Sequence, residues 1–461
     1  MATRRGTRTH HLSVAAACAA LFLSPFVGAI AIVPKALAAE GIHQGVASCA
    51  GSTCHGRQAP TGAVVRQNEL VSWQDPSSPG GAHSRAWRTL TYPRAQAIAA
   101  RLGLGPAQTA PACLGCHAEQ APPGARGARF QVSDGVGCES CHGASEGWLA
   151  SHYTVGVSHA ANVSRGMVAL ENPAVRADVC LDCHWGGDKP NQFVSHRMMS
   201  AGHPRLFFEL ELFTAFQQHH DVDADYRARK ASADGVRTWA IGQSMALERI
   251  LTVYGTGRAQ DGVFPEFYFF DCHSCHRPIS DNPGATLTVE RNPGRPIPSG
   301  APPFNDETMI MLAAAARTAS PALAERFQAD SRAFHQALTT DRASAVAAAS
   351  RLASTTRALT GDFASSPFSR ADTFAILDDV LGDALAPRFT DYSGGAQAVM
   401  AVDTLLTALV DQGQVDGGAV RALRPELDRA YAAVRDPNAW RPQEFRRVMR
   451  GIAGSVRRLR G

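Results

Sequence analysis

Cys138-Glu139-Ser140-Cys141-His142 is one of five stretches in which a cysteine pair is followed directly by a histidine. Three others have the same spacing, and one has four residues between its cysteines. These four stretches are Cys49-Ala50-Gly51-Ser52-Thr53-Cys54-His55, Cys113-Leu114-Gly115-Cys116-His117, Cys180-Leu181-Asp182-Cys183-His184 and Cys272-His273-Ser274-Cys275-His276. Of the 11 cysteines, only Cys18 lies outside the five stretches.

This pattern has a specific chemical use. Two thiols three residues apart can each add to one vinyl group of the same porphyrin, and the adjacent histidine then lies where its imidazole meets the iron. We therefore predict that all five stretches, the longer first one included, attach haem c covalently and supply one axial ligand each. Five disulfides or a zinc ribbon would also use cysteine pairs, but neither explains a histidine after every second cysteine.

The N-terminal segment has the features of an export signal. Three arginines among the first eight residues precede an apolar run over residues 12–33, and Ala36-Leu37-Ala38 offers the small residues that a signal peptidase needs. We predict a signal peptide over residues 1–38 and a periplasmic or otherwise exported protein. An uncleaved membrane anchor is the alternative, because the run is long enough to span a bilayer.

Charge argues against nucleic acid as a partner. The chain has 45 Lys and Arg against 41 Asp and Glu, and four of the basic residues fall within residues 1–38. The remaining chain is formally neutral, and haem propionates would make it acidic. Binding to nucleic acid needs a strong basic excess.

The second axial ligand of each iron separates an electron carrier from a catalyst. Ten histidines beyond residue 38 lie outside the final positions of the five motifs. They are His43, His83, His152, His159, His196, His203, His219, His220, His273 and His335. Methionine is the alternative ligand, and Met167, Met198 and Met199 lie in the right region.

Several residues around the motifs resemble a known family. They are Trp73, Asp75, His83-Ser84-Arg85-Ala86-Trp87, Gly135-Val136-Gly137, Gly143, Trp148, Gly166-Met167 and Gly202-His203-Pro204-Arg205. With the motifs, the residues up to Gly143 resemble the tetrahaem cytochromes of the cytochrome c-554 type, which accept electrons from hydroxylamine oxidoreductase. The residues from Trp148 to His152, Gly166-Met167, His196 and Gly202 to Arg205 resemble multihaem cytochromes that have a fifth motif and a helical tail. The resemblance covers about residues 43–280, and a fifth motif and a long tail depart from the tetrahaem pattern.

The resemblance implies four distal ligands and an electron-transfer role. By this resemblance, His83, His152, His196 and His203 are the predicted distal ligands, while His43, His159 and His219 compete for the fifth position. Lysine replaces the motif histidine at the catalytic haem of pentahaem nitrite reductases. All five motifs here end in histidine, which argues against a nitrite reductase of this kind.

The chain divides by composition. We predict a mainly α protein, with a haem-packed domain of little regular structure over residues 40–280, a Pro/Gly-rich linker over 281–304 and an all-α bundle over 305–461. Apolar periodicity indicates helices at 93–102, 206–218 and 236–254 in the first part. In the tail it indicates helices from Asn305 to 317 and from Ser320-Pro321 onward. Further helices are expected at 342–358, 371–385, 396–411, 418–434 and 442–459.

The last predicted helix is rich in arginine. Its basic residues are Arg446, Arg447, Arg450, Arg457, Arg458 and Arg460. They form either a solvated face or a docking patch for an acidic redox partner or a membrane surface. In the same tail we expect His335 to face solvent.

Three functions fit these observations. The leading interpretation is an exported cytochrome with five six-coordinate haems that passes electrons between respiratory partners, such as other cytochromes or a membrane quinol-oxidising complex. The alternative is an oxidoreductase with one open haem acting on a small nitrogen or sulfur compound. In the third, the tail is an interaction module that fixes the haem region within a larger complex.

Overall fold

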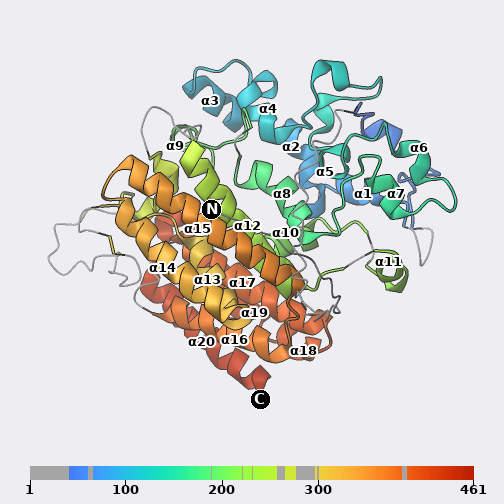
Figure 1. Cartoon of the computed structure of the whole chain (residues 1–461). Coiled ribbons are helices and arrows are strands. Elements are labelled where there is room, and N and C mark those ends of the chain that lie inside the picture. Colours follow the sequence, from blue (N-terminus) through green and yellow to red (C-terminus); the bar gives the residue numbers. More distant parts are fainter. Residues whose placement is uncertain are drawn as a thin grey trace, which may run out of the picture. The chain divides into compact units, whose positions relative to one another are not determined.

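The computed structural model describes residues 41–60, 66–187, 189–220, 222–230, 232–256, 265–276, 296–297, 301–386 and 392–461. The predicted signal peptide lies outside the described residues, and so does most of the predicted linker. The described part is mainly α-helical and contains no β-strand, which confirms the predicted fold class (Figure 1). Its only β pairing consists of the isolated bridges His43 to Arg126 and Phe270 to Phe304.

The first part of the chain contains short helices. They are α1 (Glu69–Gln74), α2 (Ala86–Thr89), α3 (Pro93–Arg101), α4 (Pro111–His117), α5 (Glu139–His142), α6 (Leu149–His152), α7 (His159–Val163), α8 (Pro173–His184), α9 (His196–Ser200), α10 (Leu210–Phe216) and α11 (Ala224–Arg229). Short 3-10 segments also occur before, between and after these helices, at Val46–Ser48, Pro79–Arg85, Ala107–Thr109, Pro123–Ala125, Val132–Asp134, Phe267–Phe269 and Cys272–Ser274.

Three of these short helices end at the histidine of a motif, namely α4, α5 and α8. Proline fixes the start of two of them, since Pro111 and Pro173 occupy the first turn, where the missing N–H is not needed. The helix therefore presents the cysteine pair and the histidine in its last turn. In α4 and α8, local sequence thus sets the orientation of the motif.

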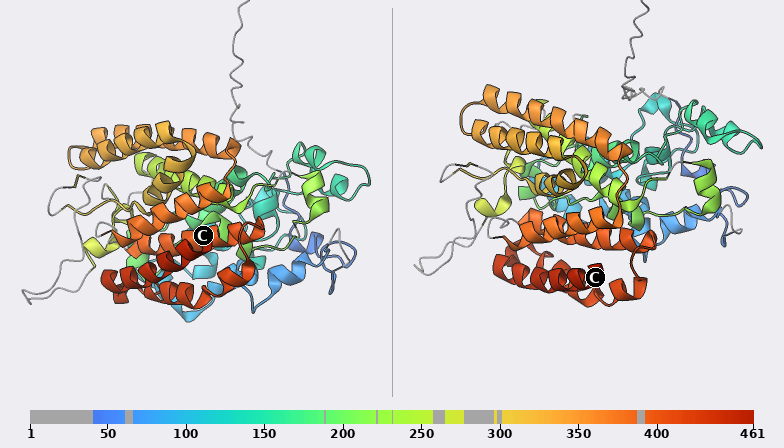
Figure 2. Two further views of the ribbon diagram at one scale, coloured as in Figure 1. Left: turned by 90° about the horizontal axis from the view of Figure 1, so that it is seen from below. Right: turned by 60° about the horizontal axis from the view of Figure 1, so that its bottom comes forward.

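The later part of the chain contains long helices. They are α12 (Gly235–Thr256), α13 (Glu307–Ala319), α14 (Pro321–Ala337), α15 (Arg342–Ser365), α16 (Arg370–Leu385), α17 (Tyr392–Asp411), α18 (Gly417–Arg421), α19 (Arg424–Ala433) and α20 (Pro442–Arg460), with a 3-10 turn at Pro437–Ala439. Figure 2 shows the helices coloured orange to red lying alongside one another. Within the described residues, only α17 is long and apolar enough to cross a membrane. Of its apolar 18-residue stretch, 83% is buried inside the fold.

The tail differs from the predicted helices in several places: α15 ends at Ser365 where 358 was predicted, and α17 begins at Tyr392 where 396 was predicted. Residues 418–434 form two helices, α18 and α19, because the chain turns at Ala422 and Leu423 before Pro425 enters the first turn of α19. The capping position of α13 is Asp306 and not Asn305. The amide of Asn305 instead holds the first residue of the helix, with its Nδ2 donating to Glu307 Oε1 over 2.9 Å.

Helix α12 lies in the range predicted for the haem domain, yet it packs against α13, α15 and α17 (Figure 1). Trp239 and Leu247 of α12 are fully buried in the same apolar core as Leu405 of α17. The division into a haem domain and a separate bundle stays a prediction. The structure gives both parts a shared core, which also includes Leu181 of the fourth motif.

Polar contacts also join the two parts. Arg249 of α12 donates from Nη2 to Asp178 Oδ1 over 2.6 Å and from Nη1 to Asp182 Oδ1 over 2.7 Å. Asp182 lies between the cysteines of the fourth motif, and Lys189 is its second cationic partner. The fourth motif is thus held directly against α12 of the later part.

Candidate haem-binding sites

All five cysteine–histidine motifs lie within the described residues, and their ten cysteines form no disulfide there. Motifs far apart in sequence meet through their thiols. Cys49 lies close to Cys138, and Cys116 lies close to Cys183. The backbone N–H of Gly45 donates to Glu139 Oε2 over 2.7 Å, and Cys183 Sγ donates to the Gly115 carbonyl over 3.8 Å. The first motif therefore adjoins the third, and the second adjoins the fourth.

A glycine makes one of these approaches possible. Gly115 lies between the cysteines of the second motif, and a Cβ added there would come 1.9 Å from the carbonyl oxygen of Asn191. The Asn191 backbone has a φ of 64°, a left-handed conformation that costs free energy in a residue other than glycine. Gln192 fastens the contact, because its Nε2 donates to the Gly115 carbonyl over 3.1 Å. The chain after the fourth motif thus lies directly against the second.

Each motif histidine faces a second histidine. The ring centres are 6.0 Å apart for His55 and His152, 6.3 Å for His117 and His203, 6.1 Å for His184 and His83, and 6.1 Å for His276 and His196. The remaining motif histidine, His142 of the third motif, faces two histidines, with ring centres 6.3 Å from His219 and 6.1 Å from His220.

These separations fit an iron held between two imidazoles. An imidazole nitrogen binds a transition metal at about 2 Å, so two imidazoles on opposite sides of one metal have ring centres roughly 6 Å apart. The four histidines predicted as distal ligands, His83, His152, His196 and His203, all lie opposite a motif histidine. The geometry supports histidine over methionine as the second ligand at each site.

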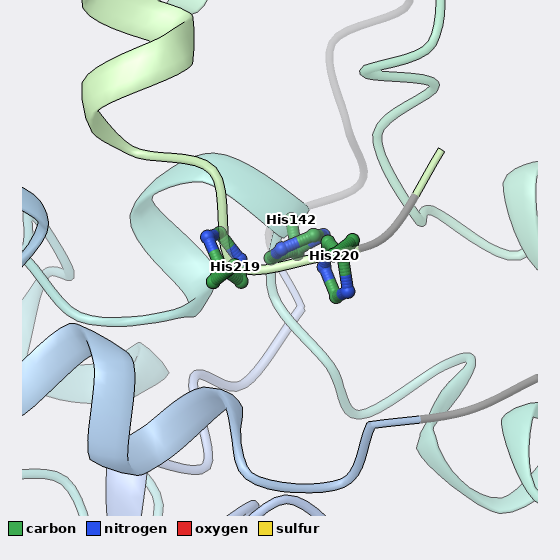
Figure 3. A group of neighbouring side chains, drawn as sticks. All are labelled: His142, His219 and His220. Atoms are coloured by element: carbon green, nitrogen blue, oxygen red, sulfur yellow. The ribbon is translucent and has the colours of Figure 1, made fainter. Parts of the chain in front are cut away.

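Of the three candidates for the fifth distal ligand, His43, His159 and His219, it is His219 that lies beside His142. Figure 3 shows His219 and His220, on the segment that follows α10, gathered beside His142 at the end of α5. Possible ligand atoms of the three residues lie within 4.8 Å of one another. His43 and His159 lie elsewhere and pair with carboxylates, His43 Nδ1 with Glu119 over 2.7 Å and His159 Nε2 with Glu171 over 2.9 Å.

Among the motif histidines and the histidines opposite them, which we call the facing histidines, five have a hydrogen-bonded Nδ1. The acceptors are Glu69 Oε2 for His55 at 2.9 Å, Gln217 Oε1 for His83 at 3.1 Å, Ala86 O for His117 at 3.0 Å, Pro204 O for His203 at 2.8 Å and Gln217 O for His219 at 2.6 Å. An Nδ1–H that donates fixes the tautomer and the ring orientation, and it leaves Nε2 for a metal. His159 is bonded through Nε2 and lacks this arrangement.

Burial keeps most of these rings neutral, which is the form that binds a metal. Desolvation lowers the pKa of His184 and of His219 to about 4, and it lowers the pKa of His142 well below its usual value. His55 is the exception, because its hydrogen bond to Glu69 raises its pKa. Burial alone would raise the pKa of Glu69, but the nearby His220 ring and the hydrogen bond from His55 outweigh burial and hold that pKa well below its usual range.

With this geometry in place, one comparison with known proteins is informative. Residues 48–143 match the family of cytochrome c554 and c-prime. The match supports a c-type cytochrome that binds haem c covalently and transfers electrons. It contains the first three motifs and His83, while the last two motifs and the C-terminal helices lie outside it. No curated protein and no solved structure is significantly similar to the chain.

Sequence reasoning missed several parts of the sites. Glu69 and Gln217 were not singled out, although each accepts a hydrogen bond from a facing histidine. His220 is not predicted for the fifth distal position, and the only signal for it in the sequence is its place beside His219.

Two further histidines lie in or against the later part of the chain. His273 Nε2 lies 2.6 Å from Pro437 O, and His335 is fully buried in α14. The expectation that His335 faces solvent is therefore wrong, because the apolar core surrounds it.

Proposed function

We propose that this chain is an exported pentahaem cytochrome in which all five haems are six-coordinate and serve electron transfer. The observation that supports it best is the set of five motif histidines, each facing a further histidine at 6.0 to 6.3 Å between ring centres. When bound, haem c supplies a reversible one-electron change at its iron.

The protein residues would do three things for these haems. The ten motif cysteines would hold them by thioether bonds, and the paired histidines would occupy both axial positions and leave none for a substrate. Nδ1 hydrogen bonds fix the rings, so little rearrangement accompanies a change of charge. The contacts of Cys49 with Cys138 and of Cys116 with Cys183 place attachment points side by side, which suits transfer between neighbouring centres.

The alternative, an oxidoreductase with one open haem, needs a motif histidine that no second histidine faces. In the described part of the chain every motif histidine has one opposite it. The proposal of a pure electron carrier is therefore the better supported one.

Spectroscopy and mass measurement test the proposal together. The purified protein should exceed its polypeptide mass by five haems, a pyridine haemochrome assay should give five haems per chain, and ferric electron paramagnetic resonance should show only low-spin signals. A high-spin signal with a cyanide-responsive absorption band would show an open iron and favour the enzymatic alternative. A smaller haem number would contradict attachment at one or more motifs.

The partners that fit this function are redox proteins, either other cytochromes or a membrane quinol-oxidising complex. The arginine face of α20 is a surface on which an acidic partner would dock. Phe445, Met449 and Ile452 are buried on one side of the helix, while Arg450 and Arg457 are exposed on the other. Opposite charge speeds the encounter of two proteins and orients them.

A further inference from the structure

Glu69 distinguishes the first haem site from the others. It is the first residue of α1 and is only 8% exposed. Its Oε2 accepts a hydrogen bond from His55 Nδ1 over 2.9 Å, and its Oε1 lies 3.7 Å from His220 Nδ1. One buried carboxylate thus contacts the proximal histidine of the first motif and a histidine at the third site.

A strained segment keeps Glu69 in this place. Gln67 has a φ of 58°, and its backbone N–H donates to Glu69 Oε1 over 3.3 Å. The Gln67 carbonyl accepts from the backbone of Arg57 over 2.8 Å, and its Nε2 donates to Thr53 O over 3.1 Å. Residues in such conformations persist only where the surroundings hold them, and they gather at functional sites. Here the strain fastens the carboxylate to the loop of the first motif.

The ring acceptors at the other sites are neutral. His117, His203 and His219 donate to backbone carbonyls, and His83 donates to the side-chain amide of Gln217. Compared with these rings, His55 differs in the charge of its hydrogen-bond acceptor. His220, which also lies beside His142, approaches the same carboxylate at 3.7 Å. A carboxylate on Nδ1 makes the imidazole a more basic ligand, which stabilises ferric over ferrous iron.

We propose that Glu69 is a positioning residue that tunes the first haem through His55 and gives it the lowest reduction potential of the five. This inference rests on the proposed function, because it takes all five sites to be occupied. As electrons enter the protein, the site at His55 would be the last to be reduced.

The test is a redox titration of the full-length holoprotein, followed by its visible α band and by electron paramagnetic resonance. In Glu69→Gln the most negative step should move to a more positive potential, while the other steps stay in place. The g values of one low-spin ferric signal should shift as well, since the imidazole loses its charged partner. Glu171→Gln is the matched control: it removes a carboxylate from His159, which faces no motif histidine, and should leave the titration unchanged.

Two results would overturn the role of Glu69. One is a Glu69→Gln protein that keeps five low-spin haems with its most negative step unmoved. The other comes from His220→Gln, which decides the question if the glutamine variant fails to mature. Without His220, the carboxylate loses one partner and interacts more strongly with His55, so the most negative step should become more negative, and an unmoved step would contradict the inference. High-spin signals in the unsubstituted protein would overturn the proposed function instead, and the shift in Glu69→Gln would still decide the role of Glu69.

Discussion

At the scale of single residues, the candidate sites depend on hydrogen bonds that free one nitrogen of each imidazole. Gln217 illustrates this most clearly, because it serves two sites at once. Its side chain accepts from His83 and its carbonyl accepts from His219, so one residue orients the distal rings that face His184 and His142. Neighbouring sites therefore share their supporting residues as well as their thiol contacts.

The choice between His219 and His220 gives the first prediction. His219 is half-buried and its Nδ1–H is used by Gln217, whereas the His220 side chain is 45% exposed and faces Glu69. We expect His219→Ala to convert one ferric haem to high spin and His220→Ala to leave all five low-spin, as measured by electron paramagnetic resonance. His159→Ala is the control and should change nothing. A low-spin His219→Ala protein would assign the ligand role to His220.

Gly115 gives a second prediction at this scale. Alanine there would drive its Cβ into the Asn191 carbonyl. Because a Cβ is fixed to its own backbone and the carbonyl is part of the other backbone, the second motif and the segment at Asn191 must separate. Overpacking of this kind costs on the order of 1–3 kcal/mol. We expect Gly115→Ala to lower the thermal unfolding temperature of the holoprotein, measured by circular dichroism. Gly105→Ala, where the added Cβ meets nothing within 4 Å, should leave that temperature nearly unchanged, and equal effects of the two substitutions would refute the explanation.

At the scale of elements, the sequence predicts what is local. The spacing of two cysteines and a histidine within five to seven residues predicts covalent haem attachment. Apolar periodicity predicts both ends of α12 and of α20 to within two residues of the observed ends. Apolar periodicity did not show that 418–434 breaks in two, although Pro425, which enters the first turn of α19, is a local signal for the break. Nor did it find Glu69 or Gln217, since nothing in the chain between Gln217 and His83, 134 residues away, marks them as partners. His219 could not be separated from His43 and His159 for the same reason.

The arginine face of α20 gives a prediction at the scale of this element. Arg450 and Arg457 are exposed and their replacement leaves the buried side of the helix intact. We expect Arg450→Glu with Arg457→Glu to slow electron transfer to an acidic soluble c-type cytochrome at low ionic strength, by stopped-flow spectroscopy, with the difference fading as salt screens the charges. Arg351→Glu, on the exposed side of α15, is the control. An unchanged rate in the double variant would show that α20 is only a solvated face.

At the scale of the whole described chain, the later helices and the haem sites share one core. Leu181 inside the fourth motif and Phe208, whose ring stacks on His184 at 4.7 Å between ring centres, belong to the same apolar cluster as α12, α15 and α17. Gln397 of α17 donates to the Phe208 carbonyl over 2.9 Å. The tail therefore supports at least the fourth candidate site through this core.

This shared core predicts the outcome of removing residues 301–461. The deletion would expose Trp239, Leu247 and other buried residues of α12, and each large apolar side chain contributes about 1.5–3 kcal/mol when buried. Removing α12 as well cannot avoid this exposure, because the fifth motif follows α12 in the chain and would be lost with it. We expect the truncated protein to aggregate or to carry fewer than five haems, measured by size-exclusion chromatography and a pyridine haemochrome assay. The Arg450→Glu, Arg457→Glu protein, whose core is intact, should keep all five. A soluble, monomeric truncation with five haems would show instead that the haem region folds independently and that the tail serves interaction alone.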